Sequence, residues 1–295
     1  MIDAYLAGPA YVLGETPVAY TEVDGFEERA RDYKMAPRPA LWGWGTVRRT
    51  SRSLADLAIE AGRATLARAG ERPDALIICS TRFAGGAESH GAFVAEVTAG
   101  LGVADVAFLG ITLNRCTNLL VAIDVATAFV QSGRHASVLV VTTDRVADET
   151  ERMTNFALFS DGAAACLVTR EPADHAIQAT ATAQRTADLD WSNEISSDLA
   201  REVNDALFKP AGITVEQITG VSGTNLYLPL VSMKERQAGY AGAQLFTANI
   251  ARVGHCFAAD PLINLVDRGV PRAGELHVLA ASVPGARAGV LLQAR

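Results

Sequence analysis

One cysteine, Cys116, stands where a protein can make a thiol reactive. An apolar run, residues 106–111, precedes it, and residues 117–130 have helical spacing that ends near Gly133. The pattern predicts a strand, a turn that carries the thiol, and a helix. Backbone N–H groups and the positive end of the helix dipole favour a thiolate at such a junction. Cys116 is therefore a candidate nucleophile for attack on a carbonyl; the alternative is a buried structural thiol.

The other cysteines do not indicate a metal or disulfide site. The four cysteines are far apart and form no CxxC pair, which argues against a disulfide framework and against zinc. Cys79 and Cys166 lie in apolar or alanine-rich runs, so we expect both to be small buried core residues. No phosphate-binding fingerprint or metal-ligand spacing is present, so we expect no cofactor and no metal.

Composition narrows the class of protein. The 295 residues are 49% hydrophobic and 20% charged, with a net charge of −7, so the chain can bury a sizeable core. The negative charge argues against nucleic acid or an anionic membrane as main partner. No apolar run reaches membrane-spanning length, and the N-terminus lacks a signal-peptide pattern, so we expect a cytoplasmic protein.

Strands and helices alternate along the chain. The predicted helices are 53–69 (Ser53 as N-cap, Gly70 as stop), 88–101, 117–130, 192–208, 226–239 and 257–268. The predicted strands are 75–80, 105–111, 136–143, 217–222, 276–281 and 288–292, with a strand–turn–strand pair at 156–159 and 163–168. Such alternation implies an α/β architecture with mostly buried sheets.

The stretch 171–190 is polar and rich in alanine and threonine, which makes it the best candidate junction. It would divide the chain into an N-terminal half, 1–170, that carries the cysteine, and a C-terminal half, 171–295.

The order of these segments resembles the thiolase-fold β-ketoacyl-acyl-carrier-protein synthases of the ketosynthase III type, over nearly the whole chain. The family's Ala-Cys-Ser-Gly-Phe corresponds to 115–119, its Ser-Gly-Arg to 132–134, its Phe-Gly-Asp-Gly-Ala-Gly-Ala to 159–165, and its early Arg-Arg stretch to 45–49. The resemblance implies a thiolase fold, in which two similar halves form a five-layered αβαβα sandwich, and a homodimer.

Three departures from the family pattern bear on function. The family's His-Gln-Ala-Asn segment reads Ser-Gly-Thr-Asn here, so Ser222 replaces the histidine. Its Gly-Asn-Thr segment reads Gly-His-Cys, so His255 replaces the asparagine. Its C-terminal Gly-Gly-Gly best matches Val-Pro-Gly at 283–285, and proline has no N–H to complete an oxyanion hole. A slip of one residue would give that role to Gly285.

The remaining groups suffice for acyl transfer. Decarboxylative condensation depends on paired donors at the substrate oxygen, and losing one such donor typically costs ~10²–10³ in rate. A thiol and an imidazole, in contrast, can take an acyl group from a thioester and deprotonate an incoming nucleophile. Asp260 follows His255 by five residues and is a candidate to orient its ring; Ser222, Thr224 and Asn225 are competing candidates.

Substrate binding is expected to involve residues in segments that match the family. Acyl-carrier proteins and coenzyme A are anionic, so basic residues around a pocket mouth would form a docking patch. The candidates are Arg48, Arg49, Lys234, Arg236 and Arg252. In the family the region of Ala87 and Glu88 reaches across the dimer to the partner's acyl pocket, and Glu88 or His90 is an alternative base.

These features predict an acyltransferase that accepts an acyl group on Cys116 from an acyl-carrier protein or coenzyme A. It would pass that group to a hydroxyl or amine acceptor in a biosynthetic pathway. Two alternatives stay open: a decarboxylating ketosynthase III, and a non-catalytic partner subunit of a heterodimeric synthase.

Overall fold

The computed structural model describes residues 2–81, 83, 87–189 and 197–295. Its main sheet has the strand order β10-β9-β11-β12-β8-β1-β7-β6-β4-β5. One set of five strands comprises β1 (Tyr5–Leu13), β4 (Ala75–Cys79), β5 (Ala107–Ile111), β6 (Ser137–Asp144) and β7 (Gly162–Thr169). The other comprises β8 (His175–Gln184), β9 (Ile218–Ser222), β10 (Leu245–Phe246), β11 (Leu276–Val283) and β12 (Ala286–Ala294).

The two sets have the same topology. In the first, β1, β7 and β6 are antiparallel neighbours, and β4 and β5 continue parallel to β6. In the second, β8, β12 and β11 are antiparallel, and β9 and β10 continue parallel to β11. A short pairing of β1 with β8, in which Leu6 faces His175, joins the sets. The chain therefore has the two similar halves that its fold class implies.

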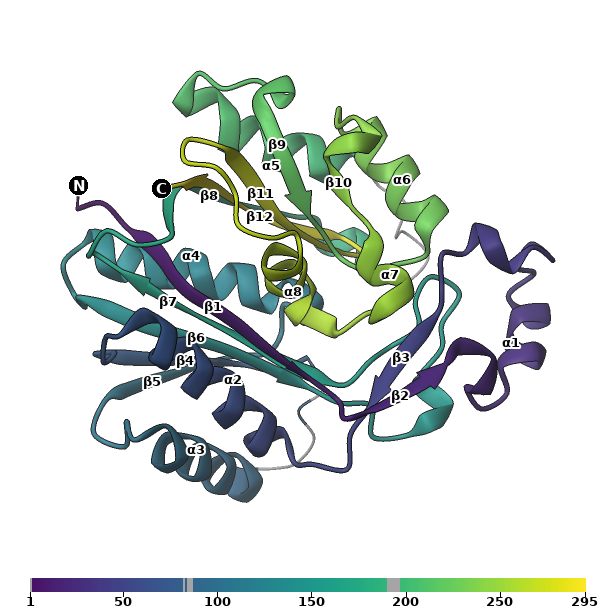
Figure 1. The fold of residues 1–295 in the computed structure, drawn as a ribbon, viewed down its shortest axis with the longest axis horizontal. Coiled ribbons are helices and arrows are strands. Elements are labelled where there is room, and N and C mark those ends of the chain that lie inside the picture. The colour runs from purple at the N-terminus through teal and green to yellow at the C-terminus, as the bar shows by residue number, and fades with distance from the viewer. Residues whose placement is uncertain (1, 82, 84–86, 190–196) are drawn as a thin grey trace.

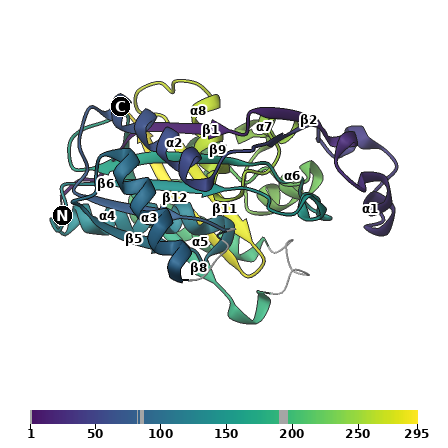
Figure 2. The same cartoon turned by 90° about the horizontal axis from the view of Figure 1, so that it is seen from below.

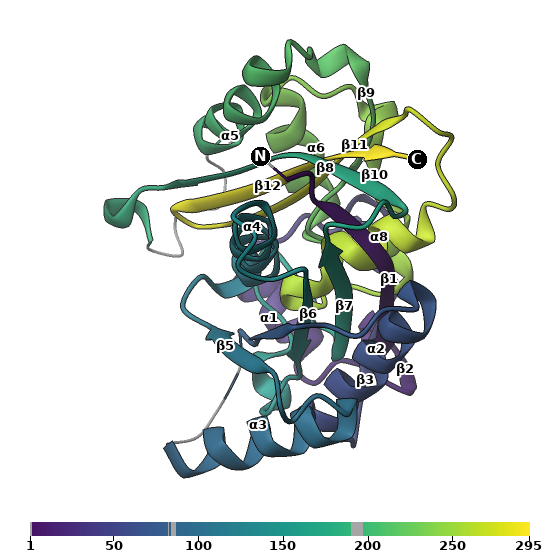
Figure 3. The same ribbon diagram turned by 90° about the vertical axis from the view of Figure 1, so that its left-hand side faces the viewer.

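The helices form the remaining layers. They are α1 (Phe26–Asp32), α2 (Leu54–Ala69), α3 (Ala87–Leu101), α4 (Asn118–Gln131), α5 (Asp198–Phe208), α6 (Leu228–Gln237), α7 (Ala248–Arg252) and α8 (Asp260–Asp267). Helices α4 and α8 lie between the two sets of strands, while α2 and α3 cover one outer face and α5 the other (Figures 1 and 3). Along β4, Ile77 packs inward and Leu76 outward, which is the alternation of a strand buried on both faces.

Local signals account for the helix ends. Ser53 caps α2 by accepting a hydrogen bond from the Asp56 N–H, and Asp56 reaches back to the Ser53 N–H. Gly70 ends this helix with a φ of +67°, which glycine adopts without strain. The predicted helix at 53–69 is confirmed with both of its caps.

The two central helices begin alike. A 3₁₀ turn precedes each of them, Arg115–Thr117 before α4 and Phe257–Ala259 before α8. Both turns start with a non-glycine residue at positive φ, 53° at Arg115 and 50° at Phe257, a conformation that costs such residues about 1–3 kcal/mol. Cys116 therefore lies in a strained turn just before the helix.

One predicted strand does not form, and the stretch predicted as the junction between the halves contains a strand. Residues 156–159 form only isolated bridges, because Phe159 pairs with His255 and Leu158 with Met153. The stretch 171–190 contains β8, which pairs with β12 along most of its length and with β1 at its start. The small side chains of β8 hid it, because alanine is a weak strand former in isolation. The start predicted for the helix at 192–208 falls in residues 190–196, outside the described residues.

A small second sheet extends the molecule at one end. Strand β2 (Thr16–Ala19) pairs with β3 (Thr46–Arg49), and the segment that joins them includes α1 and projects beyond the layers (Figure 2). Trp42 and Trp44 from this segment pack in one apolar cluster with Cys116. In the part of the chain that the structure describes, no helix has the length and apolar character needed to cross a bilayer.

Candidate active site

The thiol and the imidazole meet at the ends of the two central helices. The Cys116 Sγ lies 3.3 Å from the His255 Nε2, although the residues are 139 positions apart. Cys116 comes from the turn before α4, and His255 from the segment before α8. Both residues are buried, with 7% and 1% of their surfaces exposed. The similar starts of the two central helices, α4 and α8, thus bring a nucleophile and a base into contact.

Asp260, the first residue of α8, orients the imidazole from the other side. The His255 Nδ1 donates to Asp260 Oδ2 over 2.5 Å. The same oxygen accepts a hydrogen bond from the Asn225 N–H at 2.7 Å, and Oδ1 accepts one from the Cys256 N–H at 2.7 Å. These contacts fix the carboxylate. The series Cys116–His255–Asp260 therefore has the connectivity of a nucleophile, a base and an orienting acid.

The charges around His255 favour its protonated form. Burial lowers the pKa of this ring, but the Asp260 carboxylate and the Cys116 sulfur outweigh burial and raise the pKa to about 10. The ring is then an imidazolium near neutral pH, and an imidazolium beside the sulfur stabilises a thiolate. The resting site is best described as an ion pair of the His255 imidazolium with the Asp260 carboxylate, in contact with the Cys116 sulfur.

Aromatic rings and backbone bonds hold His255 in place. Its ring centroid lies 5.1 Å from that of Phe159 and 5.8 Å from that of Phe257. The His255 N–H donates to the Leu158 carbonyl, and its carbonyl accepts from the Ser160 N–H. The apolar segment 156–159, predicted to be a strand, thus serves as a wall for the imidazole.

The repeat of the fold explains why Asp260 is where it is. Asn118 is the first residue of α4, and its Oδ1 accepts a hydrogen bond from the N–H of Asn114, four residues earlier. Asp260 accepts one from the N–H of Cys256, also four residues earlier. Both residues have φ and ψ of −47°. In the sequence Asn118 shows no sign of this role, because its only signal is this structural equivalence with Asp260.

The hairpin turn between β11 and β12 lies against the nucleophile turn. The Arg115 guanidinium donates to the Pro284 carbonyl at 2.6 Å. Gly285 has a φ of +70°, and a Cβ at this position would come within 2.7 Å of the Asp188 backbone. A cavity of about 330 Å³ opens beside the turn, lined by Leu113, Asn114, Arg115, Gln184, Leu189, Val283 and Ala286. The role of Gly285 as an oxyanion donor remains a prediction.

Ser222 and Asn225 do not orient the imidazole with their side chains. Ser222 ends β9, and its buried Oγ has no hydrogen-bond partner among the described residues. Asn225 reaches the site through its backbone N–H, which donates to Asp260. The Thr224 hydroxyl accepts from the Ser282 N–H instead of contacting the ring. Of the candidate orienters, Asp260 is the one that contacts the imidazole.

The basic residues predicted to form a docking patch are mostly buried or paired with carboxylates among the described residues. Lys234 is buried, with 2% of its surface exposed. Arg49 pairs with Glu149 at 2.9 Å, and Arg252 pairs with Asp267. Arg48 lies half-buried in β3, and Arg236 is exposed on α6. The sequence could not predict these ion pairs, because their acidic partners come from segments that only the fold brings near.

The loop candidates have different outcomes. The side chains of Ala87 and Glu88 lie outside the described residues, although α3 begins at Ala87. His90 is exposed on α3 and packs against Phe83, with ring centroids 4.6 Å apart. It lines a cavity of about 260 Å³ between α3, β4 and β5. None of the contacts described for His90 involves Cys116.

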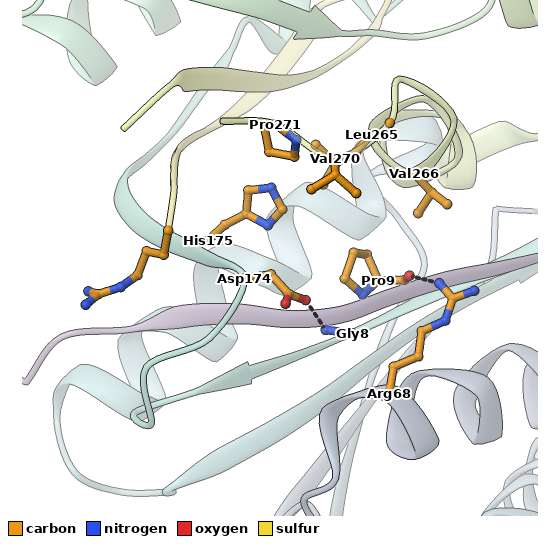
Figure 4. Close-up of a pocket in the computed structure, with 11 residues that line it drawn as sticks. Gly8, Pro9, Arg68, Asp174, His175, Leu265, Val266, Val270 and Pro271 are labelled. Carbon is orange, nitrogen blue, oxygen red and sulfur yellow. Dashed lines mark hydrogen bonds between the residues drawn. The ribbon is translucent and has the colours of Figure 1, made fainter. Parts of the chain in front are cut away.

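A larger cavity, of about 390 Å³, lies at the other end of α8 from Asp260. Leu265 and Val266 of that helix line it together with β1 and the start of β8 (Figure 4). His175 points into this space, while Asp174 accepts a hydrogen bond from the Gly8 N–H. Since neither Cys116 nor His255 lines this cavity, we do not assign it to the reaction.

Comparison with known proteins agrees with this architecture. Residues 112–186, which include Cys116, match the family model of 3-oxoacyl-[acyl-carrier-protein] synthase III. No curated protein sequence matches the chain significantly.

Solved structures match the fold over almost its full length. The synthase III of Aquifex aeolicus VF5 is 19% identical, with a TM-score of 0.81 and coverage of 98% of this chain and 99% of its own. ChlB3, described as an acyltransferase, is 19% identical, with a TM-score of 0.84 and coverage of 99% and 98%. Cerulenin-bound OleA of Xanthomonas campestris is 18% identical, with a TM-score of 0.81 and coverage of 99% and 98%.

These similarities, taken with the two alike halves, confirm the thiolase fold predicted from the sequence. The matched segment carries the candidate nucleophile, and the fold provides the second half of the site. The chain has the thiolase fold, and its residues 112–186 are similar to the synthase III family.

Proposed function

We propose that the protein is an acyltransferase that moves an acyl group from the thioester of an acyl-carrier protein or coenzyme A, through Cys116, to a hydroxyl or amine acceptor. The observation that carries the proposal is the unbroken contact series from the Cys116 sulfur through His255 to Asp260. Such a series fits a nucleophile that is acylated and a base that activates a second substrate.

In the first half-reaction the Cys116 thiolate attacks the donor carbonyl. The new C–S bond forms, and the carrier leaves as a thiol with the proton that His255 held. Acylation removes the negative charge on the sulfur, which is one of the two charges that raise the pKa of His255. Burial of the ring remains, so the pKa of His255 falls and more of the imidazole is in the neutral form that can accept a proton.

In the second half-reaction the acceptor hydroxyl or amine gives its proton to the His255 Nε2 and attacks the thioester carbonyl. The tetrahedral intermediate collapses, the C–S bond breaks, and the thiolate returns beside an imidazolium. General-base assistance of this kind typically contributes ~10²–10⁴ in rate. Asp260 keeps the ring oriented throughout and stabilises its positive charge.

The match to the synthase III family model favours one alternative, a decarboxylating ketosynthase. Ser222 stands where the family has a histidine that donates to the enolate oxygen, and Pro284 has no N–H to donate. The site therefore has fewer hydrogen-bond donors for decarboxylation. Release of radiolabelled carbon dioxide from a malonyl carrier would favour the ketosynthase over the acyltransferase.

Intact-mass analysis tests the proposal. After incubation with a panel of acyl-carrier and coenzyme A thioesters, the wild type is expected to gain one acyl mass and Cys116→Ala none. His255→Ala is expected to form an adduct but to transfer it ~10²–10⁴ more slowly. His135→Ala, on a turn outside the site, is the matched control. No adduct with any thioester would favour a non-catalytic subunit.

A further inference from the structure

Two buried charged residues that the mechanism does not use form an ion pair beside the β11–β12 hairpin. The Arg287 guanidinium donates two hydrogen bonds to the Glu235 carboxylate, at 2.6 Å and 2.9 Å. The two residues are 3% and 4% exposed. Burial alone would raise the pKa of Glu235, but the Arg287 charge outweighs burial and lowers this pKa, so the carboxylate stays ionised. Because an apolar pair of similar volume is often as stable as a buried ion pair, stability alone does not explain the Glu235–Arg287 pair.

The Glu235–Arg287 pair and the nucleophile lie on opposite faces of this hairpin. Ala286 belongs to the apolar cluster that contains Cys116, and Arg287, the next residue of β12, therefore points to the other face. Gly289, which shares the face of Arg287, lies against α5. The pair thus supports the hairpin from the outer layer, while the cluster of Cys116 covers the hairpin from the central layer.

The guanidinium also joins the two strands of the hairpin. Arg287 is the cross-strand partner of Ser282, and it donates to the Ser282 Oγ at 2.8 Å. Between these two residues lies the turn whose Pro284 carbonyl accepts the hydrogen bond of Arg115. The Glu235–Arg287 pair therefore fixes the base of the turn, and the tip of the turn binds the nucleophile segment.

The helix that carries Glu235 is connected to the other half of the triad. Glu235 lies in α6, and the segment before this helix includes Asn225, whose N–H donates to Asp260. The same segment contacts the hairpin, because the Ser282 N–H donates to the Thr224 Oγ1. The Glu235–Arg287 pair therefore links the part of the chain that fixes the carboxylate to the hairpin that contacts the nucleophile turn.

We propose that Glu235 and Arg287 are positioning residues, which act through the β11–β12 hairpin to hold the Cys116 sulfur against the His255 imidazole. None of the contacts described for either residue involves the sulfur or the ring. Without the pair the hairpin shifts, and Arg115 shifts with it. The sulfur then moves away from the imidazolium, and less of the thiol is ionised at low pH. This role rests on Cys116 as the nucleophile of the proposed acyl transfer.

The test replaces the ion pair by an apolar pair, Glu235→Leu together with Arg287→Met, which leaves no buried charge without its partner. The free energy of unfolding, measured in urea, is expected to stay close to that of the wild type. The readout is the rate of Cys116 alkylation by iodoacetamide at pH 6 divided by the rate at pH 9, with the alkylated residue verified by peptide mass. A retreat of the sulfur by about 1 Å weakens its attraction to the imidazolium enough to lower this ratio roughly fivefold.

Two further variants separate positioning from a loss of stability. Thr65→Val removes a buried hydrogen bond to the Ala165 carbonyl in the outer layer of the first half, so it is expected to lower stability and to leave the alkylation ratio unchanged. Arg287→Lys keeps the charge but cannot make two parallel bonds to Glu235, so it is expected to lower the ratio by less than the apolar pair does.

The outcomes separate this assignment from the proposed function. An alkylation ratio that the apolar pair does not change, or that Thr65→Val lowers equally, overturns the positioning role alone. If the apolar pair does not fold, the ratio in Arg287→Lys decides in the same way. Alkylation requires no thioester, so failure of every thioester to acylate Cys116 overturns the acyl transfer, and the ratio still tests the Glu235–Arg287 pair.

Discussion

At the residue scale, one carboxylate serves structure and chemistry together. Asp260 accepts the Cys256 N–H in the way that Asn118 accepts the Asn114 N–H in the other half. Asp260 differs from Asn118 in its second carboxylate oxygen, Oδ2, which binds the imidazole. A capping position thus becomes an orienting group when a histidine stands five residues earlier. A carboxylate is required for this role, since an amide cannot stabilise an imidazolium to the same extent.

Replacing Asp260 by asparagine tests this charge. The pKa of His255 is expected to fall, because burial lowers it and the largest charge that raises it is removed. The imidazolium that stabilises the thiolate is then lost near neutral pH. Alkylation of Cys116 by iodoacetamide at pH 6 is expected to slow by on the order of tenfold or more. Asp267→Asn, at the other end of α8, is the control; equal rates in both variants would contradict the assignment.

The residues of the candidate triad could be predicted because Cys116 precedes a predicted helix and His255 and Asp260 lie in or just after a segment that matches the family pattern. Cys116 and Asp260 each stand where a helix begins, and His255 follows a glycine that ends the preceding segment. The docking residues could not be predicted in the same way. Arg49 and Arg252 read as exposed cations in the sequence, but their carboxylate partners are distant in the chain or on another helix.

At the element scale, the turn before α4 holds the nucleophile under backbone strain. Arg115 has a φ of 53°, and its guanidinium binds the Pro284 carbonyl in the β11–β12 turn. The strain and the hydrogen bond act together to place Cys116. The turn and the helix after it were predictable from the apolar spacing, whereas the strain in the turn was not, because arginine gives no sign of a positive φ.

Two substitutions of Arg115 separate the effect of backbone strain from the effect of the guanidinium contact. Arg115→Ala and Arg115→Gly both remove the guanidinium, but only glycine accepts the positive φ without strain. The glycine variant is expected to be more stable than the alanine variant by about 1 kcal/mol, as measured by urea unfolding. The same exchange at Ala122, inside α4, should have the opposite sign, since glycine destabilises a helix interior. Equal stabilities at position 115 would show that the turn relaxes.

The strands that the sequence predicted best are those of the buried parallel core. The run that forms β4 is apolar at every position, and β6 is buried throughout. One of the strands that the sequence did not predict, β8, alternates small and polar residues, a pattern that indicates a junction as readily as a strand. The strand wrongly predicted, at 156–159, is apolar because it packs against His255 and not because it belongs to the sheet. A hydrophobic run indicates that a segment is buried, but it does not indicate which other segment it packs against.

At the scale of the whole molecule, the site couples stability to pH. The pKa of His255 is raised from 6.5 to about 10, so the folded state binds this proton more tightly than the unfolded chain does. The stabilisation from this proton is fully present below pH 6.5 and is lost as pH rises through about 10. The site therefore favours folding most where its ion pair is intact.

Urea unfolding of wild type and His255→Gln at several pH values measures this contribution. The difference in the free energy of unfolding is expected to shrink between pH 6.5 and pH 10, because the wild type alone loses the bound proton. In Cys116→Ala the loss should begin at lower pH, since one of the two charges that raise the pKa of His255 is absent. A wild-type difference that does not change with pH would contradict the ion pair.

The edge of the sheet supports the proposal that the protein is a homodimer. Strand β5 lies at the end of the strand order and pairs only with β4 among the described strands. Most of its residues are exposed, including Phe108 at 57% and Leu109 at 39%. An exposed apolar edge strand is a template for pairing with another chain, and a two-fold axis would let β5 pair with its own copy.

Sedimentation velocity tests this interface directly. Phe108→Glu places a charge on the edge and, across a two-fold axis, a second one on the partner. The wild type is expected to sediment as a dimer at micromolar concentration and this variant as a monomer. Val270→Glu changes a residue that is 99% exposed on the loop after α8, so it controls for added charge alone. A wild-type monomer, or a dimer that persists in Phe108→Glu, would place any self-association elsewhere.

Since β5 leads into the segment that carries Cys116, loss of the dimer is also expected to slow acylation of the thiol, whereas Val270→Glu should leave it unchanged.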